Sequence, residues 1–385
     1  MGKPKIRFKG FDNDWEQRKL PEFVSFFNGL TYTPDDVEET GTLVLRSSNV
    51  KNGEIVDADN VYVNDKVAVS ENVREGDIIV VVRNGSRALI GKHAQIKASM
   101  PSTVIGAFMS GMRSEHSSFV NALLDTSAFE NEIAKNMGAT INQITGYMFS
   151  KMEFMIPSGD EQRKIGEYFQ SLDHLITLHQ RKCEDTKKLK KYMLQKMFPQ
   201  NGSKVPEIRF KGFTDDWEQR KLKEIADKVS EKNKNNEFSE PFTNSAEQGI
   251  ISQKDYFDRE IVNNENLDSY YIVRNDDFIY NPRISVMAPV GPINRNRLGR
   301  NGVMSPLYTV FRTHDIDNLY LEFYFKTTKW HRFMKLNGDS GARFDRFTIS
   351  STQFMEMPIP YPMLDEQRKI GEYFDSLDNL ITLHQ

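Results

Sequence analysis

Apolar residues recur at alternating steps of three and four along one long stretch of the chain, which is typical of a helix with a coiled-coil seam. The stretch begins after Asp160, a residue type that caps helices, and it ends at Pro199. A helix over residues 161–198 would be about 57 Å long at the usual rise per residue. The seam residues are Ile165, Tyr168, Phe169, Leu172, Leu175, Ile176, His179, Cys183, Thr186, Leu189, Met193 and Met197.

The first half of this helical stretch occurs twice. The sequence "DEQRKIGEYFQSLDHLITLHQ" (160–180) returns as "DEQRKIGEYFDSLDNLITLHQ" (365–385), and 19 of the 21 residues are identical. A helix much longer than the average of about 11–12 residues needs a partner along its length, so we expect the two repeats to pack antiparallel. The basic continuation "RKCEDTKKLKKYMLQKMF" (181–198) has no second counterpart. Either the chain is truncated or its second half lacks part of the helix pair.

A second repeated block precedes each variable part of the chain. "FKGFDNDWEQRKL" (8–20) and "FKGFTDDWEQRKL" (210–222) share 11 of 13 residues, whereas residues 21–159 and 223–364 look different. Repeated blocks around different segments indicate one fold used twice, with a pseudo-two-fold axis and two different surfaces. We expect the blocks to preserve a contact made twice with the same partner. A duplication without symmetric use is less favoured, because drift would not spare only the blocks.

One short stretch still aligns within the variable segments. In "REGDIIVVVR" (74–83) and "RNDDFIYNPR" (274–283), an arginine, an aspartate and a second arginine fall at the same positions. Short strands are expected around "TLVLRSSNV" (42–50) and "GDIIVVV" (76–82). The fold class is therefore α+β, with two pseudo-symmetric mixed α/β domains joined by long antiparallel coiled-coil helices. The expected boundaries are a domain at 1–159, a helix at 160–199, a domain at 200–364 and a helix at 365–385.

Composition excludes several classes of protein. The chain has 385 residues, of which 38% are hydrophobic and 27% are charged, and it has no run of about 18 apolar residues and no apolar leader. We therefore expect no membrane segment and no secretion signal. The single cysteine, Cys183, favours a reducing, cytoplasmic location. A net charge of −3 argues against coating nucleic acid by charge alone.

No catalytic or metal-binding motif stands out. "IGKHA" (90–94) lacks the first glycine and the hydroxyl of a phosphate-binding loop. "NPRI" (281–284) lacks the second proline and the aromatic residue of the amino-methyltransferase motif, and we interpret it as a turn. The histidines and the cysteine show no paired ligand spacing, so we expect no catalytic residue and no metal site.

The order of these elements resembles the specificity subunit of type I restriction-modification systems. The resemblance rests on the doubled F-K-G-F-x-x-x-W-E-Q-R-K-L blocks, the doubled D-E-Q-R-K-I-G-E-Y-F-x-S-L-D helices and the "GDII" strand before a variable loop. It covers essentially the whole chain, except the missing end of the second helix. It implies two target-recognition domains that each read half of a split site on double-stranded DNA. The helices would then be a spacer that fixes the gap between the half-sites.

The same resemblance implies partners and cofactors. The repeated blocks and helices would dock two methyltransferase subunits, and two ATP-driven restriction (translocase) subunits would join those. On this interpretation the chain is a reader and a scaffold, not an enzyme, and it carries no cofactor. S-adenosylmethionine, ATP and Mg would be held by the partner subunits.

Candidate DNA contacts lie in loops rich in arginine and amide side chains, because arginine against guanine is the commonest base contact. The first loop follows an apolar strand, and the second is a basic run within an acidic chain. A third pair of segments, 136–143 and 338–347, precedes the two helices. The candidates are Arg83, Asn84, Ser86, Arg87, Lys92, Asn142, Arg283, Arg295, Asn296, Arg297, Arg300, Arg343 and Arg346. The alternative is that these residues only aid solubility or pack against the helix starts.

The aromatic entry blocks resemble a base-stacking platform, but such platforms serve unpaired bases. We favour a clamp between domain and helix that also contacts the methyltransferase. The candidate docking residues are Trp15, Trp217, Tyr168, Phe169, Tyr373 and Phe374. Two other functions stay open: a symmetric protein-interaction scaffold that does not read DNA, and a self-contained methylation or restriction enzyme. The arginine-rich loops disfavour the first, and the missing motifs disfavour the second.

Overall fold

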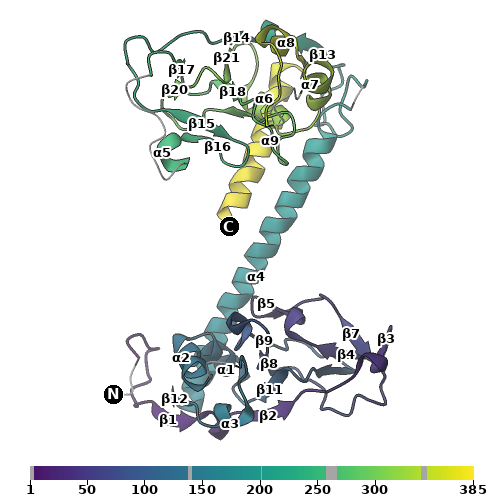
Figure 1. The fold of residues 1–385 in the computed structure, drawn as a ribbon, viewed down its shortest axis with the longest axis vertical. Helices are drawn as coiled ribbons and strands as arrows, with labels where there is room; N and C mark the ends of the chain where they lie inside the picture. The colour runs from purple at the N-terminus through teal and green to yellow at the C-terminus, as the bar shows by residue number, and fades with distance from the viewer. Residues whose placement is uncertain (1–3, 138–140, 201, 257–266, 340–344) are drawn as a thin grey trace. The chain divides into compact units, whose positions relative to one another are not determined.

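The computed structural model describes residues 4–137, 141–200, 202–256, 267–339 and 345–385. The chain divides into two compact units, residues 1–178 and 179–385 (Figure 1). Helix α4 (Gly159–Lys196) is a single helix of 38 residues that begins in the first unit and ends in the second. The spacing of its seam predicted a helix over 161–198, so both ends lie two residues earlier than expected.

The first unit is built on two small sheets. One has the order β2-β11-β8-β9, and the other has the order β10-β4-β7-β3. The central strand β8 (Ile78–Val81) is buried at all four positions, as its run of β-branched residues predicts. The other strands are β2 (Ser25–Asn28), β3 (Val37–Glu38), β4 (Thr42–Leu45), β7 (Val61–Val63), β9 (His93–Gln95), β10 (Thr103–Ile105) and β11 (Met109–Arg113).

The predicted strand at 42–50 is interrupted. Strand β4 ends at Leu45, a 3-10 turn spans Ser47–Asn49, and β5 (Val50–Lys51) follows and pairs with β6 (Glu54–Ile55). The cause is the buried Asn49 side chain, whose Oδ1 accepts the Arg46 backbone N–H at 2.9 Å and closes the turn.

The second unit repeats the four-stranded sheet. Its order is β14-β21-β18-β19, which matches β2-β11-β8-β9 strand by strand. The unit also contains two small two-stranded sheets, β15-β16 and β17-β20. The strands are β14 (Ala226–Lys228), β15 (Phe242–Ser245), β16 (Gly249–Ser252), β17 (Tyr271–Val273), β18 (Phe278–Tyr280), β19 (Ile293–Arg295), β20 (Gly302–Met304) and β21 (Thr309–Thr313).

A buried aspartate precedes the central strand of each sheet. Asp77 is 1% exposed, accepts the Arg74 backbone N–H at 2.9 Å, and binds the Arg113 guanidinium through both oxygens at 2.7 Å. These hydrogen bonds raise the pKa of Arg113. In the second unit, Asp277 makes the same pair of contacts, with the Arg274 N–H and the Arg312 guanidinium at 2.8 Å. The alignment of residues 74–83 with 274–283 is confirmed.

Helices pack against the four-stranded sheet that the two units share. A two-stranded ladder joins each entry block to the strand that precedes the repeated helix. The ladders pair β1 (Glu16–Lys19) with β12 (Glu153–Ile156), and β13 (Glu218–Lys221) with β22 (Pro358–Tyr361). The remaining helices are α1 (Ser117–Leu124), α2 (Ser127–Asn136), α3 (Gly146–Phe149), α5 (Gln253–Tyr256), α6 (Asn318–Phe325), α7 (His331–Asn337), α8 (Ser351–Met355) and α9 (Leu364–Leu383). None of the helices in the described part of the chain is long and apolar enough to cross a membrane.

A buried glutamate in the first turn of each repeated helix binds the tryptophan of the entry block (residues 8–20 or 210–222) and the arginine that immediately precedes that block. In the first unit, Glu161 accepts two hydrogen bonds from the Arg7 guanidinium, both at 2.7 Å, and one from Trp15 Nε1 at 3.2 Å. Its side chain is only 1% exposed. We call this set of contacts, Glu161 with Arg7 and Trp15, the glutamate latch. It is the clamp between domain and helix that the duplicated tryptophan predicted.

The second unit repeats the latch with the same geometry. Glu366 accepts from the Arg209 guanidinium at 2.7 and 2.8 Å and from Trp217 Nε1 at 3.1 Å. The glutamate is fully buried, and its hydrogen bonds raise the pKa of Arg209. A buried carboxylate is tolerated here because a cation and an indole N–H both satisfy it.

Two further residues of the repeated helix fit it closely to its own unit. The Gln162 side chain donates to the Pro157 carbonyl at 2.9 Å, and Gln367 donates to the Pro362 carbonyl at 2.7 Å. A Cβ on Gly166 would lie 2.7 Å from a backbone nitrogen of α1, and one on Gly371 would lie 2.6 Å from a side chain of α6. These identical residues therefore preserve a contact within each unit, and the expected contact with an external partner stays a prediction for the identical residues that are exposed.

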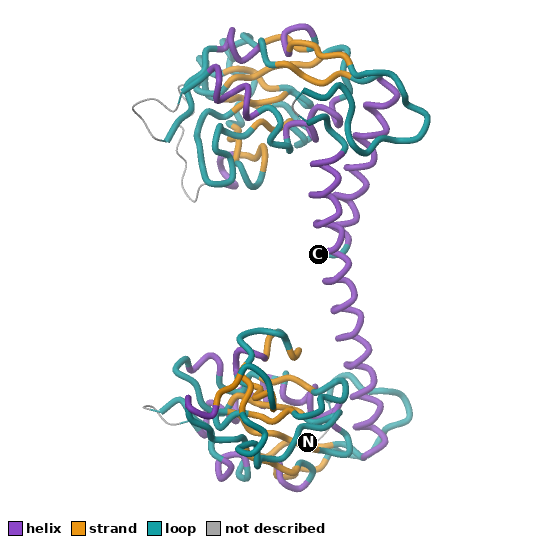
Figure 2. Tube along the Cα trace, turned by 90° about the vertical axis from the view of Figure 1, so that its right-hand side faces the viewer, coloured by secondary structure: helices purple, strands orange, loops and turns teal. Residues whose placement is uncertain are grey.

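The second half of α4 packs against α9 inside the second unit (Figure 2). The antiparallel direction is as predicted, but apart from His179 at the end of the repeat, the partner of α9 is the unrepeated part of α4 and not the repeated segment 160–180 that we had expected. Three contacts follow one another along α4 toward its C-terminus. His179 Nδ1 lies 2.8 Å from His384 Nδ1, and Cys183 Sγ lies 3.8 Å from the Ile381 carbonyl. Lys190 then forms an ion pair with Asp378. The partner numbers fall as the α4 numbers rise, so the two helices are antiparallel. This part of the seam confirms the coiled-coil prediction.

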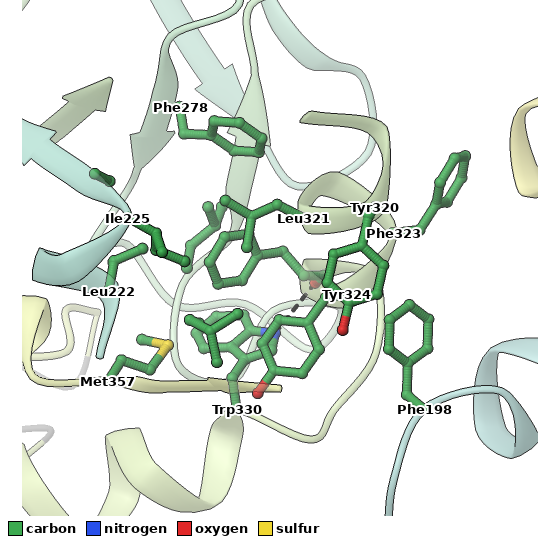
Figure 3. Packing of buried hydrophobic residues seen from close by; sticks show 14 of the residues in the cluster. Phe198, Leu222, Ile225, Phe278, Tyr320, Leu321, Phe323, Tyr324, Trp330 and Met357 are labelled. Carbon is green, nitrogen blue, oxygen red and sulfur yellow. Dashed lines mark hydrogen bonds between the residues drawn. The ribbon is translucent and has the colours of Figure 1, made fainter. Parts of the chain in front are cut away.

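Aromatic residues fill the core at the upper end of this helix pair (Figure 3). The Phe198 ring stacks on Phe374 with centroids 6.1 Å apart, and it also lies 5.5 Å from the ring of Tyr320. Burial raises the pKa of Tyr320 far above its usual value. The Trp330 indole donates to the Phe325 carbonyl at 3.1 Å, which satisfies its buried N–H.

Replacing Glu366 by alanine should lower the free energy of unfolding of the second unit by about 3 kcal/mol, because it leaves the Arg209 guanidinium and the Trp217 N–H without their acceptor. Denaturant unfolding of the full chain, followed by tryptophan fluorescence, measures this change. The matched control is Asp365→Ala, which removes an exposed neighbour that pairs with Arg368 and should cost less than about 1 kcal/mol. Equal losses in both variants would contradict the latch.

Candidate nucleic-acid interface

The first predicted DNA-binding loop leaves the central strand of the first unit and meets a second predicted segment. Arg83, two residues beyond β8, forms an antiparallel bridge with Gln143. The Asn142 side chain donates to the Gly85 carbonyl at 3.1 Å, and the Asn84 N–H donates to the Asn142 carbonyl at 3.4 Å. The structure therefore brings together two segments that the sequence placed far apart.

An exposed aromatic residue that sequence reasoning missed lies beside this loop. The Arg83 guanidinium lies over the Phe108 ring, 5.0 Å from its centroid, and Phe108 is 56% exposed. The Phe108 carbonyl accepts the backbone N–H groups of Val82 and Arg83 at 2.9 and 3.2 Å, which fixes the approach. The signal in the sequence is weak: one aromatic residue in a short stretch with two glycines, "IGAFMSG" (105–111).

The side chains of two predicted DNA-binding residues, Asn84 and Lys92, point toward the protein and fix the loop that follows β8. The Asn84 side chain donates to Ser47 Oγ at 3.2 Å, and Lys92 Nζ donates to the Ser47 carbonyl at 3.3 Å. Ser86 and Arg87 lie on the exposed side of the same loop. Asn84 and Lys92 therefore position the loop, and Arg83, Ser86 and Arg87 form its outer surface.

A cavity of about 670 Å³ opens next to Phe108. Tyr32, Arg46 and Ser48 line it together with apolar residues. The Arg46 guanidinium is held by Asp59, yet its Nε and the Ser48 hydroxyl are buried with no hydrogen-bond partner among the described residues.

The second unit places an arginine pair at the equivalent position. Arg283 follows β18 as Arg83 follows β8, and it forms an antiparallel bridge with Arg346. Arg283 is exposed and Arg346 is half-buried. Arg343 lies outside the described residues. The two units therefore carry the same bridge with different side chains: arginine opposite glutamine in the first, arginine opposite arginine in the second.

The basic run of the second unit is mostly neutralised by the protein itself, which corrects part of the prediction. Asn296 is fully buried and donates to the carbonyls of Arg274 and Arg300 at 3.0 Å. The Arg295 side chain is 11% exposed and binds Glu322 and Asp276 at 2.8 and 2.9 Å. Asn296 is wrong as a DNA contact, because its side chain is buried, whereas Arg295 keeps a small exposed fraction and stays a prediction that its two ion pairs disfavour.

Two other arginines of this run are half-exposed but already paired. Arg297 binds Glu322 at 2.8 Å and Asp375 at 3.0 Å. Arg300 binds both oxygens of Glu240 at 2.8 Å, which raises its own pKa and lowers that of the carboxyl. These arginines lie at the surface, but their charge is offset by carboxylates of the same unit.

The predicted docking residues divide in the same way. Trp217 is 5% exposed and Phe374 is fully buried, so both pack inside the second unit and their prediction as docking side chains is wrong. Trp15 is half-buried in its latch, and Tyr373 is half-buried with its ring edge on Phe210. Two docking candidates are exposed: Tyr168, with 50% of its surface accessible, and Phe169, with 46%.

Comparison with known families identifies the repeated unit. The family model described as the type I restriction modification DNA specificity domain matches residues 12–187 and again residues 214–385. The chain belongs to this family. The two matches cover both repeats of the entry block and helix, so the internal duplication corresponds to two specificity domains in one chain.

Similar proteins agree with this assignment. The chain is 25% identical over 167 residues to the type I restriction enzyme StySPI specificity subunit of Salmonella potsdam, which covers 41% of this chain and 36% of that relative. It is 23% identical to the type I restriction enzyme MjaVIII specificity subunit of Methanocaldococcus jannaschii over 96% of this chain and 87% of the relative. Its alignment with the first relative thus spans about a third of that protein.

A solved structure shares the fold. The S subunit of the type I restriction-modification system from M. genitalium superposes with a TM-score of 0.58 and 14% sequence identity, over 99% of this chain and 93% of the other. Within the described residues, no group of three or more histidine, cysteine or acidic side chains is placed to hold a metal ion.

Asn296 and Arg283 should behave differently when they are replaced by alanine. Asn296→Ala should lower the free energy of unfolding by about 1–3 kcal/mol, because two carbonyls in a buried loop lose their donor. Arg283→Ala should change it by less than about 0.5 kcal/mol, because the side chain is exposed. Urea unfolding of the two variants measures both values. If Arg283→Ala lowered the free energy of unfolding and Asn296→Ala left it unchanged, the assignment of Asn296 to the buried frame and of Arg283 to the surface would be contradicted.

Proposed function

We propose that this chain is the DNA-sequence-specificity subunit of a type I restriction-modification system and that each unit reads one half of a split DNA site. The observation that carries the proposal is the pairing of an identical frame with different surfaces. Both units use the same sheet order, the same buried aspartate and the same glutamate latch. At the end of the central strand they present different side chains.

The chemistry of these surfaces suits base edges in a DNA groove. In the first unit, Arg83 and Ser86 offer donors, and Phe108 offers an exposed apolar ring. Arginine recognises guanine through two hydrogen bonds, and an aromatic ring packs against a thymine methyl group. In the second unit, Arg283 and Arg346 are opposite each other in a backbone bridge and add two cationic residues, of which Arg346 lies 3.9 Å from Asp345. Two different donor sets on one scaffold support two different half-sites.

The chain's net charge of −3 supports a division of labour between subunits. Affinity for DNA comes mainly from neutralising phosphates, which needs a basic surface. We propose that two methyltransferase subunits supply much of that surface, and that two restriction (translocase) subunits join them. Methylation and cleavage, with S-adenosylmethionine, ATP and Mg, would then belong to the partners, and this chain would be non-catalytic.

Identical residues that stay exposed in both units are the best candidates for docking those partners. Arg163 and Lys164 lie on the outside of α4, and their repeats Arg368 and Lys369 lie on the outside of α9. The latch does not use these four side chains. A partner that docks twice on the same structure would contact the same residues twice.

Single arginine replacements test the reading of half-sites. Arg83→Ala should relax or abolish recognition at one or two base pairs of one half-site only, because each good base contact contributes about 1–3 kcal/mol of discrimination. Arg283→Ala should do the same in the other half-site only. Each variant is expressed with its methyltransferase, and methylome sequencing of the cells gives the motif.

The matched control for both variants is Lys51→Ala, an exposed cation on β5 outside both loops. It should leave the methylated motif unchanged. Motifs that are identical to wild type for both arginine variants would contradict the assignment of these loops. Loss of recognition in both halves from a single replacement would contradict the division between units.

A further inference from the structure

The loop that follows β18 in the second unit carries two neighbouring apolar residues at its outermost point. Val286 is fully exposed, and Met287 is 71% exposed. We call these two residues the apolar tip. A single exposed apolar residue is common on protein surfaces and needs no explanation. Two neighbours that both project into solvent offer an apolar surface whose burial against a ligand would be favourable.

A closed turn holds the apolar tip in place. The Ser285 N–H donates to the Ala288 carbonyl at 3.0 Å, and the Ala288 N–H donates to the Ser285 carbonyl at 3.2 Å and to the Ser285 hydroxyl at 3.1 Å. The residues on either side of the tip face inward, since Ala288 is buried and Ile284 packs against the large core cluster of the second unit. The apolar tip is therefore a fixed projection, and little conformational entropy is lost when it binds.

The base of this loop is fixed at a predicted DNA-reading arginine. The Ile284 N–H donates to the Asp345 carbonyl at 3.0 Å, and the Phe347 N–H donates to the Pro282 carbonyl at 2.7 Å. These two hydrogen bonds flank the backbone bridge that Arg283 makes. The apolar tip begins three residues after Arg283, so the same loop carries a cation at its base and an apolar projection at its end.

Charge and size favour a DNA duplex as the ligand of this loop. Arg283 and Arg346 place two cationic residues at its base, and cations are what a phosphate backbone attracts. Two side chains on a narrow turn cover too little area for a stable protein interface, which buries about 800 Å² on each partner. A narrow apolar projection with cations at its base instead suits the gap between two base pairs.

The corresponding loop of the first unit has a different form. After β8, a 3-10 turn spans Arg87–Leu89. The exposed apolar group beside the arginine is there the ring of Phe108, which lies under Arg83. The apolar tip thus belongs to the surface that differs between the units, and not to the repeated frame.

We propose that the apolar tip is a wedge that inserts between two neighbouring base pairs of the half-site read by the second unit. Apolar side chains that enter a base step in this way unstack it and bend the duplex by about 20–90°. The cost of unstacking depends on the step, and pyrimidine–purine steps open most easily. The wedge therefore adds recognition of DNA shape to the hydrogen bonds of Arg283. This inference rests on the proposed function, because it takes the second unit to be a reader of DNA.

The bend of the bound DNA tests the wedge. The full chain with its methyltransferase is bound to a duplex that carries the motif found by methylome sequencing, and dyes at the two ends report the bend by energy transfer. We expect the wild-type complex to raise energy transfer. The double replacement Val286→Ser and Met287→Ser should move it toward the value of the free duplex and weaken binding about tenfold, because the burial of two apolar side chains is lost.

A base analogue locates the opened step. 2-Aminopurine brightens when it is unstacked, and it is placed in turn at the adenines of both strands in and beside the half-site of the second unit. The adenine that is methylated is left out, because enzymes that act on a base unstack it themselves. Fluorescence beside the opened step should rise severalfold with the wild-type chain and should not rise with the double variant.

Two further variants serve as controls. Met287→Leu keeps an apolar side chain and should retain the bend. Leu336→Ser changes a residue that is 74% exposed on α7 and lines a surface pocket with Trp217 and Pro358 of the frame, and it should leave bend and affinity as in the wild type. Because all these side chains are exposed, the variants should fold normally.

The outcomes separate the wedge from the proposed function. Equal energy transfer for the wild type and the double variant would overturn the wedge, and the proposed function would stand if Arg283→Ala still changed the methylated motif. An unchanged motif with Arg283→Ala would count against the proposed function itself. Loss of a thymine from the motif of the double variant, without a change in bend, would assign the tip to methyl contacts and overturn insertion. Loss of the methyltransferase from the purified complex would assign the tip to a protein partner instead.

Discussion

The fold of each unit depends on the hydrogen bonds of one buried carboxylate at the start of its repeated helix. Glu161 and Glu366 each take two hydrogen bonds from an arginine and one from a tryptophan of the entry block. A charge this deeply buried is stable only with its full set of partners. The arginine, the tryptophan and the glutamate therefore have to stay together, although about 150 residues of variable sequence separate them.

The latch explains why the two halves of the chain share so few residues and yet one fold. The entry block, the ladder to the preceding strand and the first turns of the helix fix both ends of the variable segment. Inside that segment, the buried aspartate with its arginine sets the start of the central strand. The loop that leaves the strand is then free to carry Arg83 with Phe108 in one unit and Arg283 with Arg346 in the other. Recognition can change without a change in the frame.

The sequence predicted the features that repeat, and it failed where a contact joins distant positions in only one unit. The tryptophan clamp and the alignment of Asp77 with Asp277 follow from residues that occur twice, whereas the helix pair joins α9 to the part of α4 that occurs once. Nothing in the spacing of "INRNRLGRNG" (293–302) indicates that Glu322 and Asp276 will meet Arg295 and that Glu240 will meet Arg300. These carboxylates come from other elements of the fold, so arginines that look free in the sequence are paired. The same reason hid Phe108, whose place beside Arg83 is set by strand pairing.

The central claim is that the repeated residues form a frame and that the variable segment alone carries recognition. The most direct measurement replaces residues 21–159 with residues 223–364, so that both units carry the second surface, and then sequences the methylome of cells that express this chain with its methyltransferase. The account predicts that both halves of the methylated motif carry the bases of the original second half. A folded chain whose motif keeps its original first half would contradict it.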